Sequence, residues 1–292
     1  MTQMLSPNEF TRVLENPSER RERYAEMLPA FYSHATDAYR HHWADSFHLP
    51  PFQDGQSLPQ ALAAQEHRLA RVAGLRAGLR ALDVGCGVGG PALSIAEHSG
   101  AHVTGISIVP WQLETAEKRA AAQGLQNLTE FRNADMMALL FDDGTFDVAF
   151  SFDAICHSPD KDTVYAEIAR VLKPGGVFVG ADWLCADGLT EQEYQEWIEP
   201  VCVSSALPDV LSLGRMVSGL TRAGFLIDDY CDLAARGDMT PNWEIFERAA
   251  ETLTEPRPAG RELMYQHCLS TARAGRAGKF IIGYWSARKP TD

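Results

Sequence analysis

The chain has 292 residues, 45% of them hydrophobic, and a formal net charge of −13 from 39 acidic and 26 basic residues. Its length suffices for a full α/β core with a smaller appended element, while its negative charge repels the phosphate backbone of a nucleic acid. It has no apolar run of the roughly 20 residues that a membrane-spanning helix needs, no secretory signal, and six scattered cysteines without zinc-site spacing, which together predict a cytoplasmic protein.

The first part of the chain, up to about residue 78, has the pattern of helices. The aromatic-rich segment 31–43 is followed by the segment 58–75, in which apolar residues recur at helical spacing. We expect residues 1–58 to form a helical lid, because its aromatic side chains would otherwise be exposed to water. A helix of this kind is also able to swap between subunits, so the sequence leaves a homo-oligomer open.

The hydrophobic period changes from Arg80 onward. Short apolar runs alternate with amphipathic segments of helix length, which is typical of βαβ units. We therefore expect residues 59–292 to form a Rossmann-like α/β domain, with a seven-stranded, mostly parallel sheet, helices on both faces, and an inserted helical segment around residues 188–215. Within it, Ser158 is placed to cap a helix that begins at Pro159.

The sequence ALDVGCGVGGP, at residues 81–91, carries the strongest functional signal. An apolar strand runs directly into a loop in which Gly85 and Gly87 let a ligand approach the backbone. Asp83 lies at the carboxyl end of that strand, where doubly wound sheets bind their ligands. This arrangement favours a cofactor with an amino acid group and a cationic sulfonium over a dinucleotide.

The ends of the following strands extend this cofactor site. A dinucleotide fold places an acidic residue about 20 positions after the glycines, but Ser107 and Gln112 occupy this region and are able to bind ribose hydroxyls instead. Asp135 is placed to accept from an adenine amino group and Met136 to pack on the ring, although Asp135 also suits a simple turn. Ser151, near the end of the fourth strand, completes the predicted cofactor set.

Five segments resemble, in the same order, motifs of the sterol 24-C-methyltransferase family and its bacterial relatives. They are DSFHLPPF (45–52), LDVGCGVGGP (82–91), FSFDAICHSPD (150–160), RVLKPGGVF (170–178) and GADW (180–183). The resemblance runs from about residue 31 to about residue 235. It implies C-methylation of an alkene carbon in an isoprenoid chain, with S-adenosyl-L-methionine (SAM) as methyl donor and S-adenosyl-L-homocysteine (SAH) as product.

The chain departs from that family in two places. Asp153 stands where the family usually has glutamate, and the region after Asp232 is short and unlike the tail of the sterol enzymes. A prenylated natural product or a prenyl diphosphate is therefore at least as good a candidate acceptor as a sterol.

Alkene methylation leaves a positive charge on the neighbouring carbon, which aromatic faces stabilise by about 2 kcal/mol when water is excluded. Each aromatic candidate also suits ordinary core packing, and His48 also suits closure of the lid. The predicted substrate-binding residues are Tyr32, Tyr39, Trp43, Phe47, His48 and Trp183.

A base must then remove a proton, and Asp153, His157 and Asp182 all follow strand ends on the ligand-binding edge. Asp153 has the competing role of orienting the SAM ammonium group, and His157 that of binding backbone. No metal ligands are predicted in the chain. A diphosphate acceptor alone would call for Mg²⁺, together with the basic cluster at residues 40–42, which otherwise suits a solvent-exposed helix.

Two other functions fit the same sequence. An O- or N-methyltransferase of small metabolites needs a single base, for which His157 would suffice. A SAM-binding, cyclase-like protein would keep the cofactor site without transferring the methyl group. Both stay open beside the C-methyltransferase hypothesis.

Overall fold

A seven-stranded sheet forms the base of the structure. The structure is a computed structural model that describes residues 5–255 and 257–291, without the side chains of residues 37–42. The strand order is β3-β2-β1-β4-β5-β7-β6, with β7 antiparallel to both neighbours and the other pairs parallel. The prediction of a Rossmann-like, mostly parallel sheet is confirmed. The strands are β1 (Arg80–Val84), β2 (His102–Ser107), β3 (Thr129–Asn133), β4 (Phe146–Phe152), β5 (Leu172–Cys185), β6 (Leu226–Asp232) and β7 (Phe280–Arg288).

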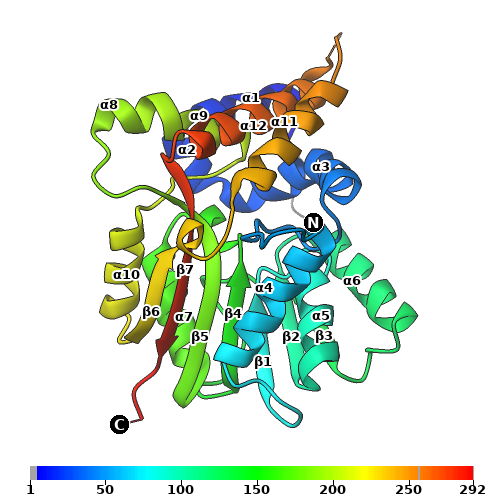
Figure 1. Ribbon diagram of the computed structural model, residues 1–292, viewed down its shortest axis with the longest axis vertical. Coiled ribbons are helices and arrows are strands. Elements are labelled where there is room, and N and C mark those ends of the chain that lie inside the picture. Colours follow the sequence, from blue (N-terminus) through cyan, green and yellow to red (C-terminus); the bar gives the residue numbers. More distant parts are fainter. Residues whose placement is uncertain (1–4, 256, 292) are drawn as a thin grey trace.

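Helices cover both faces of the sheet, as Figure 1 shows. One face packs against helices whose apolar side chains share a core with Phe150, namely α4 (Leu58–Val72), α5 (Gly90–Ser99) and α6 (Pro110–Ala122). The other face shares a core around Phe178 with α7 (Lys161–Val171) and α10 (Leu213–Arg222). Because both faces are covered, the central strands β1 and β4 are buried along most of their length.

The start of α7 lies later than the sequence analysis expected. The helix begins at Lys161 and not at Pro159, because the cap is the carboxylate of Asp160, which accepts from the Thr163 backbone N–H at 3.0 Å. Ser158 instead accepts from the backbone N–H of Asp160 at 3.2 Å. The segment between strand β4 and this helix forms the short η1 (Ile155–His157).

A layer of helices lies above the sheet in Figure 1, and we call this layer the helical cap. Three separate parts of the chain form it, and a third apolar core that includes Phe31, Ala206 and Met264 joins them. The sequence predicted helices in the first two parts but not in the third, α11–α12. The cap consists of α1 (Pro7–Glu15), α2 (Pro17–Glu22), α3 (Tyr24–His42), α8 (Glu191–Glu193), η2 (Tyr194–Ile198), α9 (Glu199–Ser204), α11 (Thr240–Thr252) and α12 (Ala259–Arg276).

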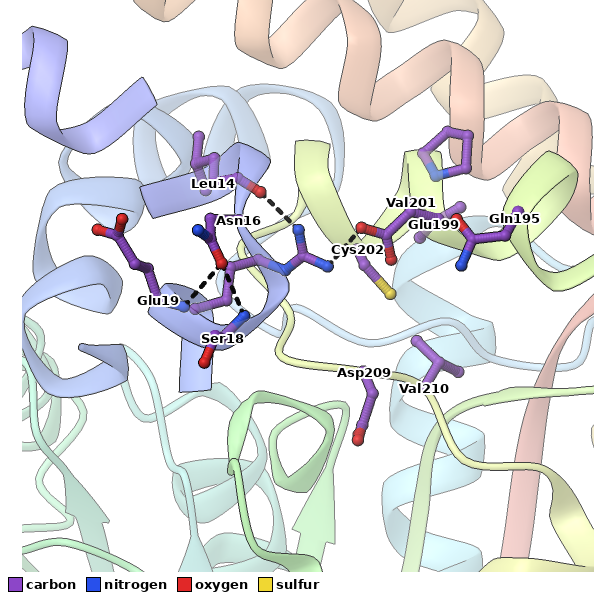
Figure 2. Close-up of polar contacts among 12 residues, drawn as sticks. Leu14, Asn16, Ser18, Glu19, Gln195, Glu199, Val201, Cys202, Asp209 and Val210 are labelled. Atoms are coloured by element: carbon purple, nitrogen blue, oxygen red, sulfur yellow. Dashed lines mark hydrogen bonds and ion pairs between the residues drawn. The ribbon is translucent and has the colours of Figure 1, made fainter. Parts of the chain in front are cut away.

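Arg20 ties the first part of the cap to the second. Its side chain is fully buried, and its guanidinium donates to the Leu14 carbonyl and to Glu199 Oε1, each at 2.6 Å. Two of the dashed lines in Figure 2 end on Leu14 and Glu199, which belong to α1 and α9. Since a buried guanidinium needs such partners, the contact fixes how the N-terminal helices lie on the inserted ones.

We expect Arg20→Ala to lower the free energy of unfolding by about 3 kcal/mol, because it leaves the Leu14 carbonyl and Glu199 without their donor. Arg12→Ala is the control, since the Arg12 side chain is 62% exposed in its ion pair with Glu19 and such pairs contribute less than about 1 kcal/mol. Urea denaturation of both variants measures the difference. Equal, small effects would contradict the anchoring role of Arg20.

Candidate cofactor and acceptor site

Two adjoining cavities lie between the carboxyl ends of the parallel strands and the helical cap. The first cavity has a volume of about 830 Å³ and the second a volume of about 440 Å³, and both volumes include the solvent-filled entrance. Tyr32, Phe47, Asp153 and His157 line both cavities. The two spaces therefore meet at these four side chains.

The glycine loop after β1 forms one wall of the first cavity. Gly85 has φ +90°, and a Cβ atom on it would lie 2.3 Å from Cβ of Ala154. Gly87 has φ +52°, but a Cβ there would come no closer than 4.0 Å, to the Phe47 ring. At Gly85, only glycine allows both this backbone conformation and the close approach of the loop that carries Asp153.

Asp83 lines the same cavity with a buried carboxyl group. Burial, and secondarily the negative charge of Glu66, raises its pKa well above the ordinary value. Its Oδ2 accepts no hydrogen bond from any residue that the structure describes. A cationic group bound in the cavity would satisfy this oxygen and stabilise its charged form, so the site fits the ammonium end of an amino acid cofactor.

Ser107 and Gln112 lie together on the wall formed by the end of β2 and the start of α6. The Ser107 hydroxyl donates to Gln112 Oε1 at 3.0 Å and accepts from the Val109 backbone N–H at 3.1 Å. This pairing leaves the amide nitrogen of Gln112 as a donor, which suits a ribose hydroxyl.

Asp135 and Met136 line the far end of the first cavity. Asp135 accepts from the Met137 backbone N–H at 2.8 Å through Oδ1, and from the Tyr24 hydroxyl through Oδ2. It therefore forms the turn that the sequence allowed and also faces the cavity. Tyr24, from α3, is a contact that the sequence analysis missed.

Aromatic side chains dominate the second cavity. Trp43 packs against Phe246 of α11 with ring centroids 4.4 Å apart, and Trp183 of β5 meets the edge of Phe280 at 5.0 Å. The Tyr39 side chain and the basic cluster at residues 40–42 lie outside the described side chains. The predicted substrate-binding residues that line this cavity are Tyr32, Trp43, Phe47, His48 and Trp183.

Asp153 places a carboxylate where the two cavities meet. Its backbone has φ +46°, and its Oδ2 accepts from the Leu49 backbone N–H at 2.9 Å. Oδ1 accepts no hydrogen bond within the described part of the chain. Burial, and after it the charge of Asp182, raises the pKa of this carboxyl well above its ordinary value. Asp153 therefore offers a strongly basic oxygen to a bound ligand.

His157 has both ring nitrogens engaged. Nδ1 lies 3.3 Å from the Ala206 carbonyl, which only an N–H donor satisfies, and Nε2 lies 3.0 Å from the Tyr32 hydroxyl. Burial lowers the pKa of the imidazole to about 4. The neutral ring therefore donates to Ala206 and accepts from Tyr32 at physiological pH.

We expect His157 to remain neutral as the pH falls from 8 towards 5, because its lowered pKa of about 4 lies below this range. The ring-proton NMR signal of His157, assigned by its loss in His157→Gln, should stay constant over the range. Movement of the signal with a midpoint near 6.5, the value of an unperturbed histidine, would contradict the burial argument.

Two predicted residues line neither cavity. Ser151 is fully buried and its hydroxyl donates to the Val84 carbonyl at 2.8 Å. Asp182 accepts at 2.8 Å from the backbone N–H groups of Cys156 and Trp183, and burial raises its pKa to about 6. Both residues lie near strand ends, but alternate side chains of a strand point to opposite faces, so proximity to the end did not suffice.

Several further lining residues were not predicted from the sequence. Leu28 and Tyr24 of α3 line the first cavity; Phe246 of α11, Ser205 after α9 and Leu49 between α3 and α4 line the second. The amphipathic pattern of α11 could have identified that helix, but no local signal connects it with the cavity. Among the residues that the structure describes, no group of three histidine, cysteine or acidic side chains is placed to hold a metal ion, and no helix is long and apolar enough to cross a bilayer.

Comparison with known proteins identifies the family. A family model described as "Methyltransferase domain" matches residues 82–180. Sterol 24-C-methyltransferase ERG6B of Gibberella zeae is 38% identical over 230 residues, covering 77% of this chain and 60% of that protein. The sterol 24-C-methyltransferase of Pneumocystis carinii is 34% identical over 266 residues, covering 90% of this chain and 68% of that protein.

A solved structure is similar over most of the chain. The crystal structure of the [4+2]-cyclase SpnF matches with a TM-score of 0.78 and 25% identity, covering 91% of this chain and 96% of that one. The chain spans about three fifths of the length of the first fungal relatives that it matches. On its similarity to the Pneumocystis carinii protein, the chain belongs to the sterol 24-C-methyltransferase-like family of SAM-dependent methyltransferases.

Proposed function

We propose that this protein is a SAM-dependent C-methyltransferase that acts in the cytoplasm on an alkene carbon of an isoprenoid acceptor. The observation that carries the proposal is Asp153, a buried carboxylate with one unpartnered oxygen where the first cavity meets an aromatic second cavity. Such a carboxylate stabilises a developing carbocation and accepts a proton from it.

The first cavity has the side chains to hold SAM, which supplies an electrophilic methyl group when bound. Asp83 would bind the ammonium group, and the pair Ser107 and Gln112 the ribose hydroxyls. Asp135 and Met136 would meet the adenine, with the Tyr24 hydroxyl already on the Asp135 carboxylate. The glycine loop lets the methionine part lie against the backbone.

The second cavity suits the acceptor. With SAM bound, the alkene π electrons would form a carbon–carbon bond to its methyl group while the methyl–sulfur bond breaks and SAH leaves with that electron pair, so that the adjacent carbon would become positively charged. The faces of Trp43, Trp183 and Phe246 exclude water and stabilise that charge by about 2 kcal/mol. Mg²⁺ enters the proposal only for a diphosphate acceptor, whose phosphates the cluster at residues 40–42 would have to meet.

Asp153 is the better candidate for the base. Loss of a proton next to the charged carbon restores an alkene, and Oδ1 of Asp153, which has no hydrogen-bond partner among the described residues, would take that proton. The Nε2 atom of His157 already accepts from Tyr32. We therefore assign His157 and Tyr32 a structural role, in which their hydrogen bond shapes the wall between the two cavities.

We expect Asp182→Asn to move the acid limb of the kcat–pH profile to lower pH. The negative charge of Asp182 helps to raise the pKa of Asp153, so its removal lets Asp153 ionise at a lower pH. Asparagine keeps one acceptor oxygen, which satisfies one of the two backbone N–H groups, those of Cys156 and Trp183, that bond the two Asp182 oxygens. Asp232→Asn is the control, because burial also raises the pKa of this β6 carboxyl, which lines neither cavity. An unchanged limb in Asp182→Asn would exclude coupling between Asp153 and Asp182.

Cyclase activity is the second candidate, favoured by the 25% identity to the [4+2]-cyclase SpnF over 91% of this chain. The same pair of cavities would then bind SAM without transfer and shape a polyene for ring closure. An O- or N-methyltransferase would need the acceptor heteroatom, and not an alkene carbon, to face the first cavity.

Incubation with SAM and a panel of acceptors separates these functions. The panel contains sterols with a side-chain alkene, prenylated aromatics, prenyl diphosphates with Mg²⁺, and phenol and amine metabolites. The proposal predicts SAH together with a product heavier by one CH₂ unit from an isoprenoid member, with the new methyl group located on carbon by NMR. Methylation of phenols or amines alone would refute it, and a product of unchanged mass without SAH would indicate a cyclase.

A further inference from the structure

A third cavity lies beside the sheet, on the far side of the His48–Gln65 contact from the second cavity. It has about 540 Å³ of space to its open mouth, and residues of α4, β7 and the segment after η3 (Leu233–Ala235) line it. Three arginines, Arg68, Arg71 and Arg236, face it, and no described lining residue is acidic. In a chain with a net charge of −13, this is a local concentration of positive charge.

Two of the three guanidinium groups have no carboxylate partner. Arg236 pairs with Asp229 and lies 4.6 Å from the centroid of the Tyr284 ring. Arg68 lies 5.5 Å from the same centroid, on the floor of the cavity. Neither Arg68 nor Arg71 forms a hydrogen bond or ion pair with another described side chain or backbone group. Their charges are therefore available to a ligand.

The side-chain amide of Gln65 is a second, independent observation that points to a ligand with hydrogen-bond acceptors. Its side chain lines the cavity and is only 5% exposed. Oε1 faces His48 Nδ1 at 3.1 Å, which leaves the amide nitrogen turned away from His48, buried and without an acceptor among the described residues. A buried donor of this kind is costly unless something accepts from it.

We propose that the third cavity binds an oxyanion of the phosphate class, either free phosphate or the phosphate group of a monoester. The forks of Arg68 and Arg71 match the oxygens of such an anion, and the Gln65 amide donates to a third oxygen. Gln65 also contacts His48, which lines the second cavity. An anion bound to the Gln65 amide would therefore be connected to the proposed acceptor site through the Gln65–His48 hydrogen bond. Such a connection suits a regulatory ligand.

Calorimetric titration of the whole chain with inorganic phosphate, and separately with glycerol phosphate, tests the proposal at constant ionic strength. Arg68→Gln and Arg71→Gln should each weaken binding about tenfold or more. Arg76→Gln removes the same charge just beyond α4, where Arg76 is exposed and bonds only the Gly74 carbonyl, so it should bind like the unaltered chain. A preference for one titrant identifies which source the cavity takes.

Two results would overturn the proposal. One is the absence of phosphate binding to the unaltered chain, and the other is equal weakening in all three variants, which would indicate a diffuse charge effect. Because the readout is binding of phosphate and not methyl transfer, neither result bears on the proposed C-methyltransferase activity.

Discussion

Replacing Asp153 with asparagine will slow methyl transfer by about a hundredfold to a thousandfold, because the variant loses both the proton acceptor and the negative charge beside the carbocation. Asparagine is the appropriate substitution. It tolerates the φ of +46° at this position, and its side-chain oxygen still accepts from the Leu49 backbone N–H. Single-turnover rates with saturating SAM and the acceptor found in the panel measure the effect.

Binding of SAH distinguishes loss of chemistry from loss of the site. We expect Asp153→Asn to bind SAH within a fewfold of the unaltered protein, since Asp83 and the glycine loop are unchanged. If Asp153 instead orients the SAM ammonium group, SAH affinity will fall together with the rate. If Asp153→Asn keeps the full rate of methyl transfer, Asp153 has no role in catalysis.

Gly85→Ala will abolish measurable SAH binding. The added Cβ would lie 2.3 Å from the Ala154 Cβ, and the φ of +90° is unfavourable for any side chain. The strand end, the glycine loop and the segment that carries Asp153 would have to separate, which alters the wall of the first cavity. Calorimetry with SAH measures the binding, and circular dichroism establishes that the variant is folded.

Gly87→Ala is the matched control, because its φ of +52° is also positive but the nearest atom to an added Cβ is 4.0 Å away. We expect a loss of stability of about 1–2 kcal/mol from the backbone conformation and only a modest loss of affinity. Equal loss of SAH binding in both variants would show that SAH affinity depends on the backbone conformation of the glycine loop, and not on the contact between Gly85 and Ala154.

The sequence was sufficient to predict the sheet and the first cavity, because their signals are local. Apolar runs bounded by glycines place the strands, and the carboxyl ends of parallel strands share one edge. Asp83, Ser107, Gln112 and Asp135 therefore converge although they lie far apart in the chain. Burial of the central strands on both faces produces these short, continuous apolar runs.

The second cavity could be predicted only in part, because it depends on how three distant segments pack. Phe246 and Ser205 reach it from α11 and from the segment after α9, and nothing in their own neighbourhoods indicates a ligand. Ser151 and Asp182 line neither cavity for a different reason, since only the three-dimensional structure shows that backbone groups occupy their side chains at these strand ends.

A crystal structure with SAH bound tests the central claim most directly, namely that one cavity holds the sulfonium nucleoside next to an aromatic chamber with a basic carboxylate. The account predicts the adenosine between Ser107 and Met136, the amino group near Asp83, and the sulfur facing Asp153 with the second cavity still unfilled. A ligand whose sulfur faces solvent or the sheet, with no open path to Trp43 and Trp183, would contradict it.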